Sequence, residues 1–137
     1  MIIGGGLAGL TTSILLQKNG YEVTLIEKKK YPFHRVCGEY VSNEVLPFLE
    51  FLGIDVAEAE PSRINKLSVS SASGRIVHAA LPLGGFGLSR YKFDNLLFKN
   101  AVALGVKFIF EKATDIQFYE DRFKVLTSVN NVYEGTL

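Results

Sequence analysis

Three glycines near the start of the chain have the spacing of a loop that binds phosphate groups. Gly4, Gly6 and Gly9 form the pattern G-x-G-x-x-G between a short apolar stretch and an apolar helical run. In such a loop the first glycine allows a tight turn, the second lets a pyrophosphate approach the backbone, and the third lets helix and strand pack closely. The phosphates then lie at the N-terminus of the helix, where unsatisfied N–H groups and the helix dipole favour anions.

The residues that follow predict the strand, turn, helix and strand that this motif needs around it. Apolar residues at helical spacing fill the run 10–16, and Gly20 stands where a helix would end. The next run, 21–27, is rich in β-forming residues and ends in Glu27, 18 positions after Gly9. A carboxylate at about this distance binds the ribose hydroxyls of an adenosine. The pattern therefore predicts a dinucleotide-binding unit rather than a glycine turn followed by a solvent-exposed glutamate.

Composition and charge exclude several other classes of protein. The formal net charge of +1 argues against a nucleic-acid-binding surface, and no apolar run is long enough to span a membrane. A single cysteine, Cys37, excludes an internal disulfide and fits a reducing compartment, so we expect a cytoplasmic protein. His34 and His78 do not combine with Cys37 in any recognisable metal-ligand spacing, so no metal site is expected.

The order of apolar patterns predicts an α/β fold. We expect a parallel core sheet from strands at Ile2, Val23 and Phe108. The remaining elements expected are a helix near 43–52, a β-hairpin over 64–80, a loop at 81–87, a helix over 91–104, and a meander with strands at 114–119, 122–128 and from 132 onward. This is a Rossmann-like dinucleotide-binding fold with an inserted hairpin and a terminal β-meander.

Both ends of the chain are shorter than this fold requires. Only three residues precede Gly4, whereas a strand usually has about five or six. A fourth core strand, expected after the meander, would lie beyond Leu137. We therefore expect an incomplete domain whose true N-terminus is missing.

Three blocks of sequence together resemble the FAD-dependent oxidoreductases of the aromatic-hydroxylase and geranylgeranyl-reductase superfamily. They are the run 4–10 followed by Glu27, the block 35–39 (Arg-Val-Cys-Gly-Glu), and the block 88–97, which contains Arg90 and Asp94. The likeness covers the whole chain and keeps its order. It implies that residues 1–137 are the N-terminal portion of an FAD-binding domain. It also implies FAD as cofactor, NAD(P)H as its reductant, and a small organic substrate for a monooxygenase or a reductase.

The same resemblance implies roles for individual residues. Arg35 would lie against the pyrophosphate or ribityl region, Arg90 would hold the ribityl-phosphate side, and Cys37 would lie near the flavin ring. Glu39 stands where the reductases have the second glycine of a Cys-Gly-Gly block. This difference weakens the inference that the protein reduces prenyl chains. The hairpin at 64–80 would begin a substrate-domain sheet, and the catalytic residues would lie beyond Leu137. The implied cofactor-binding residues are Gly4, Gly6, Gly9, Glu27, Arg35, Cys37, Gly38 and Arg90.

Three functions remain open at this point. The chain is the FAD-binding portion of a flavin-dependent oxidoreductase, an NAD-binding dehydrogenase domain, or a truncated fragment without catalysis. Glu27 suits NAD and FAD equally, whereas the block 35–39, the hairpin and the meander favour FAD. Residues 1–137 alone are expected to be inactive, and their oligomeric state is left open.

Overall fold

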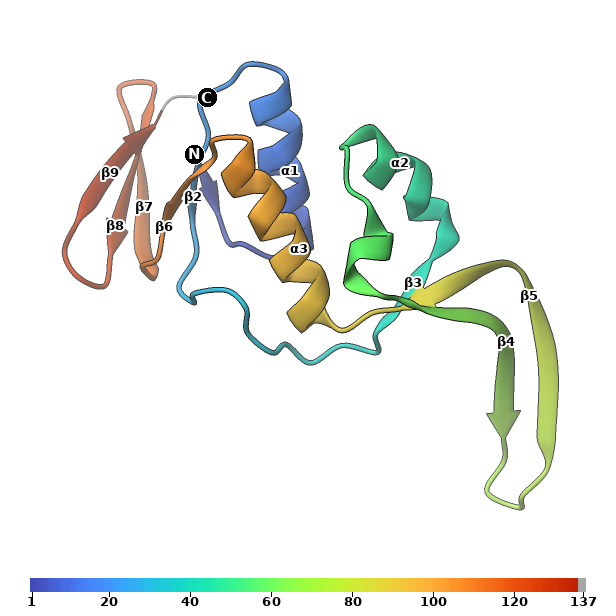
Figure 1. Cartoon of the computed structure of the whole chain (residues 1–137). Coiled ribbons are helices and arrows are strands. Elements are labelled where there is room, and N and C mark those ends of the chain that lie inside the picture. The colour runs from blue at the N-terminus through green and yellow to red at the C-terminus, as the bar shows by residue number, and fades with distance from the viewer. Residues whose placement is uncertain (136–137) are drawn as a thin grey trace. The chain divides into compact units, whose positions relative to one another are not determined.

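The computed structural model describes residues 1–135, which divide into two compact units (Figure 1). The first unit contains Met1–Phe33 and the chain from Asp94 onward, and the second contains His34–Phe93. Helix α3 (Arg90–Ala103) begins in the second unit and continues into the first. No helix of the described residues is long and apolar enough to cross a membrane.

The first unit is organised on a parallel sheet of three short strands in the order β1-β2-β6. Ile3 lies opposite Ile26, and Ile26 lies opposite Ile109 on its other side. Leu25 and Ile26 are buried because β2 is the central strand. The predicted parallel core is therefore confirmed. The bounds are β1 (Ile2–Ile3), β2 (Thr24–Ile26) and β6 (Lys107–Ile109).

Helix α1 (Leu7–Lys18) connects β1 to β2. Leu10 and Ile14, four residues apart, are fully buried because they share one face of the helix. The helix ends at Asn19, and Gly20 follows with φ +85°, a left-handed conformation that favours glycine. The predicted helix and its glycine stop are both confirmed.

An antiparallel meander follows the parallel sheet. Its strands are β7 (Ala113–Tyr119), β8 (Arg122–Thr127) and β9 (Val132–Gly135), paired in that order. Both residues of the first turn, Glu120 and Asp121, have positive φ, as a two-residue hairpin of type I′ requires. The meander predicted from alternation is confirmed.

A carboxylate at the start of the meander gathers three hydrogen bonds. Glu111 accepts from Thr127 Oγ1 at 2.6 Å, from Asn131 Nδ2 at 2.8 Å and from Tyr133 Oη at 3.1 Å. These bonds, that of Thr127 first, lower the pKa of Glu111 below its ordinary value because they stabilise the charged form. Glu111 thereby ties the segment after β6 to the turn between β8 and β9.

Replacing Glu111 with glutamine is expected to lower the stability of the protein in a pH-dependent way. Because the folded-state pKa of Glu111 is lowered, its stabilising contribution is complete above the unfolded value of about 4.3. It is lost as pH falls through the folded pKa. The stability difference between wild type and variant, measured by urea denaturation, should therefore be largest at neutral pH and shrink in acid. Glu120→Gln, in an exposed turn, is the matched control. A difference independent of pH would contradict the assigned hydrogen bonds.

The second unit is built on an antiparallel sheet in the order β3-β5-β4. One helix was predicted over 43–52, and the structure has a 3-10 helix, η1 (Asn43–Val45), followed directly by an α-helix, α2 (Leu46–Phe51). Ser42 caps the first piece, accepting from Glu44 N at 3.4 Å, and Gly53 follows the second with φ +77°. The elements are β3 (Tyr40–Ser42), η1 (Asn43–Val45), α2 (Leu46–Phe51), η2 (Val56–Ala59), β4 (Ser62–Ser70) and β5 (Ile76–Gly87).

The loop predicted at 81–87 is wrong, because β5 continues through it to Gly87. Phe86 pairs with Val41 of β3 on one side and with Arg63 of β4 on the other. A Cβ on Gly85 would lie 2.6 Å from the Val41 carbonyl oxygen, so glycine there permits close approach of two strands. The glycine cluster thus marks a crowded central strand and not a turn.

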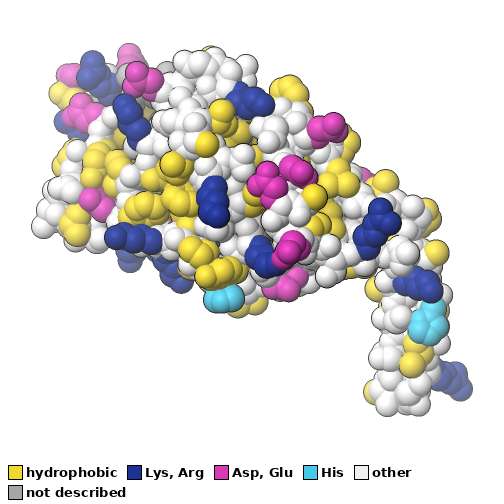
Figure 2. Space-filling view, viewed as in Figure 1, with side chains coloured by type: hydrophobic (Ala, Val, Ile, Leu, Met, Phe, Trp, Pro, Cys, Tyr) yellow, Lys and Arg dark blue, Asp and Glu magenta, His cyan; other side chains and the backbone are white. Residues whose placement is uncertain are grey.

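The predicted hairpin at 64–80 is confirmed, and its outer part is a two-stranded ribbon. On one face Leu67 lies opposite Ala79 and Val69 opposite Val77, with the three larger side chains 48–68% exposed. Figure 2 shows hydrophobic side chains, basic side chains and a histidine exposed together on this hairpin. The ribbon therefore presents an exposed apolar face.

Candidate functional site

The glycine turn after β1 has the backbone geometry that its spacing predicts. Gly4 N donates to Ile26 O at 2.8 Å, and Gly4 has φ +99°, a conformation that side chains disfavour. A Cβ on Gly9 would overlap the carbonyl oxygen of Gly4 and would lie 3.5 Å from Ile2 Cγ2. The first turn of α1 therefore lies directly against the glycine turn, which only a glycine at position 9 permits.

The N-terminus of α1 carries the features of an anion site. Gly6 is the N-cap in an extended conformation, and the first helical bond runs from Leu10 N to Gly6 O at 2.9 Å. The N–H groups of the first turn have no acceptor within the helix, and the first turn contains no acidic residue. A diphosphate group fits these donors because no carboxylate of that turn competes for them.

Glu27 follows β2 and lies beside the glycine turn. The residue is 5% exposed. Its Oε2 accepts from Gly5 N at 2.8 Å, and its Oε1 accepts from Lys29 N at 3.1 Å. Each carboxylate oxygen can accept more than one hydrogen bond, which is also what binding to ribose hydroxyls requires. The structure thus brings Glu27 to the turn formed by residues 4–6, and it shows an anchoring contact that the sequence did not indicate.

Two further residues of this site were missed by sequence reasoning. Tyr31 Oη donates a hydrogen bond to Gly5 O at 2.5 Å. A Cβ on Gly5 would overlap that hydroxyl and would lie 3.1 Å from Glu27 Cβ. The one available signal was the extra glycine at position 5, between the motif glycines Gly4 and Gly6. Nothing in the sequence connects that glycine with Tyr31.

The second group of predicted residues lies in the second unit, on two segments that run side by side. Tyr40 pairs with Gly87, and Leu88 N donates to Glu39 O at 2.9 Å. Beyond this pairing the ring of His34 stacks on the ring of Tyr91, with centroids 4.7 Å apart. Arg35 and Arg90 are the chain neighbours of these two rings, so the structure places both arginines on adjacent segments.

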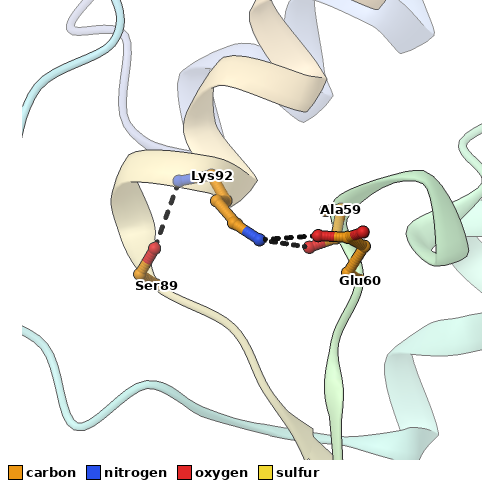
Figure 3. A network of polar contacts seen from close by, with 4 residues as sticks. All are labelled: Ala59, Glu60, Ser89 and Lys92. Atoms are coloured by element: carbon orange, nitrogen blue, oxygen red, sulfur yellow. Dashed lines mark hydrogen bonds and ion pairs between the residues drawn. The ribbon is translucent and has the colours of Figure 1, made fainter.

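Arg90 is the first residue of α3, one position earlier than the predicted start of the helix. Ser89 Oγ accepts from Lys92 N at 3.3 Å, and Lys92 Nζ donates to Ala59 O at 3.4 Å and to Glu60 Oε2 at 3.2 Å (Figure 3). These contacts cap the helix and connect its first turn to the C-terminal end of η2. A cation at a helix N-terminus opposes the helix dipole, so Arg90 does not stabilise α3 through the dipole.

Cys37 and Gly38 lie in the exposed loop that follows Arg35. Cys37 Sγ accepts from Glu39 N at 3.4 Å, and Glu39 has φ +58°. A Cβ on Gly38 would meet no atom within 4 Å, so packing within the described chain does not demand glycine there. No group of three His, Cys, Asp or Glu within residues 1–135 could hold a metal ion.

The chain is similar in sequence to curated proteins named as halogenases. The chain is 34% identical over 116 residues to "Tryptophan 2-halogenase" of Chondromyces crocatus, which covers 81% of this chain and 22% of that protein. It is 27% identical over 148 residues to "Flavin-dependent halogenase armH4" of Armillaria mellea, covering 98% of this chain and 26% of that protein. The chain thus spans about a quarter of these curated relatives.

Solved structures and a family match extend this likeness. The structure of 2-methyl-3-hydroxypyridine-5-carboxylic acid oxygenase superposes with a TM-score of 0.79 at 26% identity, covering 97% of this chain and 36% of that one. The FAD binding domain family matches residues 1–136, nearly the whole chain. The predicted resemblance is therefore confirmed: the chain belongs to the FAD binding domain family.

Proposed function

We propose that the chain is the FAD-binding part of a flavin-dependent oxidoreductase that acts on a small organic substrate. The observation that carries this proposal is the contact between the glycine turn and the Glu27 carboxylate, with Gly5 N and Glu27 Oε2 2.8 Å apart. It joins donors for a diphosphate and acceptors for a ribose at the ends of two neighbouring parallel strands. This is the arrangement that an adenine dinucleotide requires.

Different residues bind different parts of the cofactor. Gly4, Gly6 and Gly9 shape the turn that receives the pyrophosphate, and Glu27 binds the adenosine ribose. Arg35 and Arg90 bind phosphate oxygens or the ribityl chain, because a guanidinium is always charged and presents its donors as a planar fork. Cys37 and Gly38 lie near the flavin ring, where a glycine lets the ring approach the loop. FAD, when bound, supplies the redox chemistry, and the protein supplies binding and orientation.

Oxygen-dependent chemistry is favoured over prenyl reduction. The similar proteins are named as halogenases and as an oxygenase, and residue 39 is glutamate where prenyl reductases have glycine. We assign the reductant as NAD(P)H, used either directly or through a separate reductase. The hairpin β4–β5, with the exposed apolar face at Leu67, Val69 and Val77, begins the part of the enzyme that holds the substrate.

Flavin titration of the full-length protein tests this function. Wild type should bind FAD in a one-to-one ratio, and NAD(P)H, with its reductase where one is needed, should bleach the flavin absorbance. Arg35→Ala and Arg90→Ala should each raise the Kd for FAD at least about tenfold, since each removes a charged hydrogen bond worth about 1.5–3 kcal/mol.

Arg122→Ala is the matched control, because this arginine lies in β8 of the meander and its ion pair with Glu134 is long, at 3.9 Å. Its FAD affinity should equal that of wild type. If the protein binds NAD and takes up no flavin, the proposed function is wrong and an NAD-binding dehydrogenase domain is the better assignment.

A further inference from the structure

We propose that Tyr31 is a positioning residue for the pyrophosphate site, which it orients through the backbone of the glycine turn. The proposal rests on the function proposed above and adds a residue that lies outside the glycine motif. Tyr31 Oη donates to Gly5 O at 2.5 Å, a contact between residues 26 positions apart. The residue therefore connects the segment after β2 to the turn after β1.

The hydrogen bond determines the orientation of one peptide group. The carbonyl of Gly5 and the N–H of Gly6 belong to the same planar trans peptide, in which they point in opposite directions. Because Tyr31 holds the Gly5 carbonyl, the Gly6 N–H faces away from the tyrosine. Gly6 is the N-cap of α1, so this N–H joins the first-turn N–H groups that attract an anion.

The preceding peptide group is held in the same way by another partner. Gly5 N donates to Glu27 Oε2 at 2.8 Å. The backbone of Gly5 is thus held on its N–H side by the carboxylate and on its carbonyl side by the phenol. A Cβ at position 5 would overlap the Tyr31 hydroxyl, so the close approach of this ring explains why glycine occupies that position.

Tyr31 itself is held by aromatic packing. Its ring stacks on Phe98 with centroids 4.5 Å apart and an interplanar angle of 15°. Phe108 and Phe110 present their edges at 6.2 and 6.3 Å, and Phe33 lies tilted at 5.4 Å. Such contacts restrain the ring, so the hydroxyl meets Gly5 O from a fixed direction. The phosphate donors are therefore preorganised by a cluster that includes α3 and β6.

Tyr31→Phe in the full-length protein separates the hydroxyl from the packing of the ring. Loss of one neutral hydrogen bond that orients a donor should weaken FAD binding by up to about tenfold. ADP, which carries the diphosphate, should lose affinity by the same factor, whereas adenosine should bind as it does to wild type. The amide resonance of Gly6 should also shift less on ADP addition than in wild type.

Tyr133→Phe is the matched control, because it likewise removes a tyrosine hydroxyl bond in the first unit, at 3.1 Å to Glu111. It should leave the Kd for FAD and ADP unchanged. Thermal melting of the apo-proteins should give similar midpoints for the two variants, which shows that Tyr31→Phe is folded.

Two results would overturn the role of Tyr31 and leave the proposed function intact. One is wild-type affinity of Tyr31→Phe for FAD and ADP, and the other is an equal loss for adenosine and ADP, which indicates general damage. A wild-type protein that binds neither FAD nor ADP would overturn the proposed function together with this inference.

Discussion

Gly9→Val is expected to abolish flavin retention and to destabilise the protein. A Cβ at position 9 would overlap the carbonyl oxygen of Gly4 and would lie 3.1 Å from its carbonyl carbon. These atoms belong to the backbone of the turn itself, so they cannot yield by changing a rotamer. Overpacking at a tight contact costs about 1–3 kcal/mol, and relief here requires that α1 move away from the turn. The donors at its N-terminus then lose their position.

Chemical denaturation and flavin content of the purified full-length protein measure the two effects. Gly38→Val is the stability control, because a Cβ there would meet no atom within 4 Å. With the flavin removed from all three proteins, the unfolding midpoint of Gly38→Val should match that of wild type, whereas that of Gly9→Val should fall. A Gly9→Val protein that retained stoichiometric flavin would show that the contact between α1 and the turn is unimportant for the cofactor.

The sequence predicted the elements whose signals are local. Helix α1 follows from apolar residues at helical spacing and a glycine stop, and the meander follows from alternation and two short turns. The parallel core was predicted because a glycine motif, a helix and β-rich runs occur in the order of a βαβ unit. These features depend on residues that are close in sequence, so one chain suffices to recognise them.

The sequence failed where a residue's role depends on a distant neighbour. The glycines at 84–87 indicate a loop by composition, yet Gly85 is required because Tyr40 and Val41 of β3 approach it closely. Tyr31 belongs to the candidate site only because the chain returns to Gly5 after a helix and a strand. The stacking of His34 on Tyr91 is likewise a contact across 57 positions. Such pairs are visible only in three dimensions.

A contact with a residue distant in the sequence also changes the expected effect of Glu27→Ala. Sequence reasoning predicts a loss of flavin binding with an intact fold, since the carboxylate is seen there only as a ribose ligand. In the structure Glu27 is buried and accepts from Gly5 N and Lys29 N. Removing it therefore withdraws an acceptor from a buried N–H, which costs about 1–3 kcal/mol. Glu27→Ala should lower both the unfolding midpoint and the affinity for FAD.

Glu27→Gln separates these two contributions. Its amide oxygen still accepts from Gly5 N, so the turn should persist. Its NH2 group cannot accept from Lys29 N, but Lys29 is an exposed residue whose N–H can bind water instead. The unfolding midpoint should therefore stay closer to that of wild type than the midpoint of Glu27→Ala does. The charge is lost, and charged hydrogen bonds are about twice as strong as neutral ones, so affinity for FAD should fall by about tenfold. Glu27→Ala should lose about 100-fold or more, because two bonds to ribose hydroxyls disappear.

Flavin fluorescence titration and thermal melting of the two variants, each in the full-length protein, measure the effects independently. The wild-type carboxylate should also repel a 2′-phosphate, so NADP should not compete with FAD for this turn in wild type and should do so weakly in Glu27→Gln. Equal losses of stability in Glu27→Gln and Glu27→Ala would show that Gly5 N requires the charge and not merely an acceptor. Unchanged FAD affinity in both would remove Glu27 from the ribose site, and the glycine turn would then need another residue to select the adenosine.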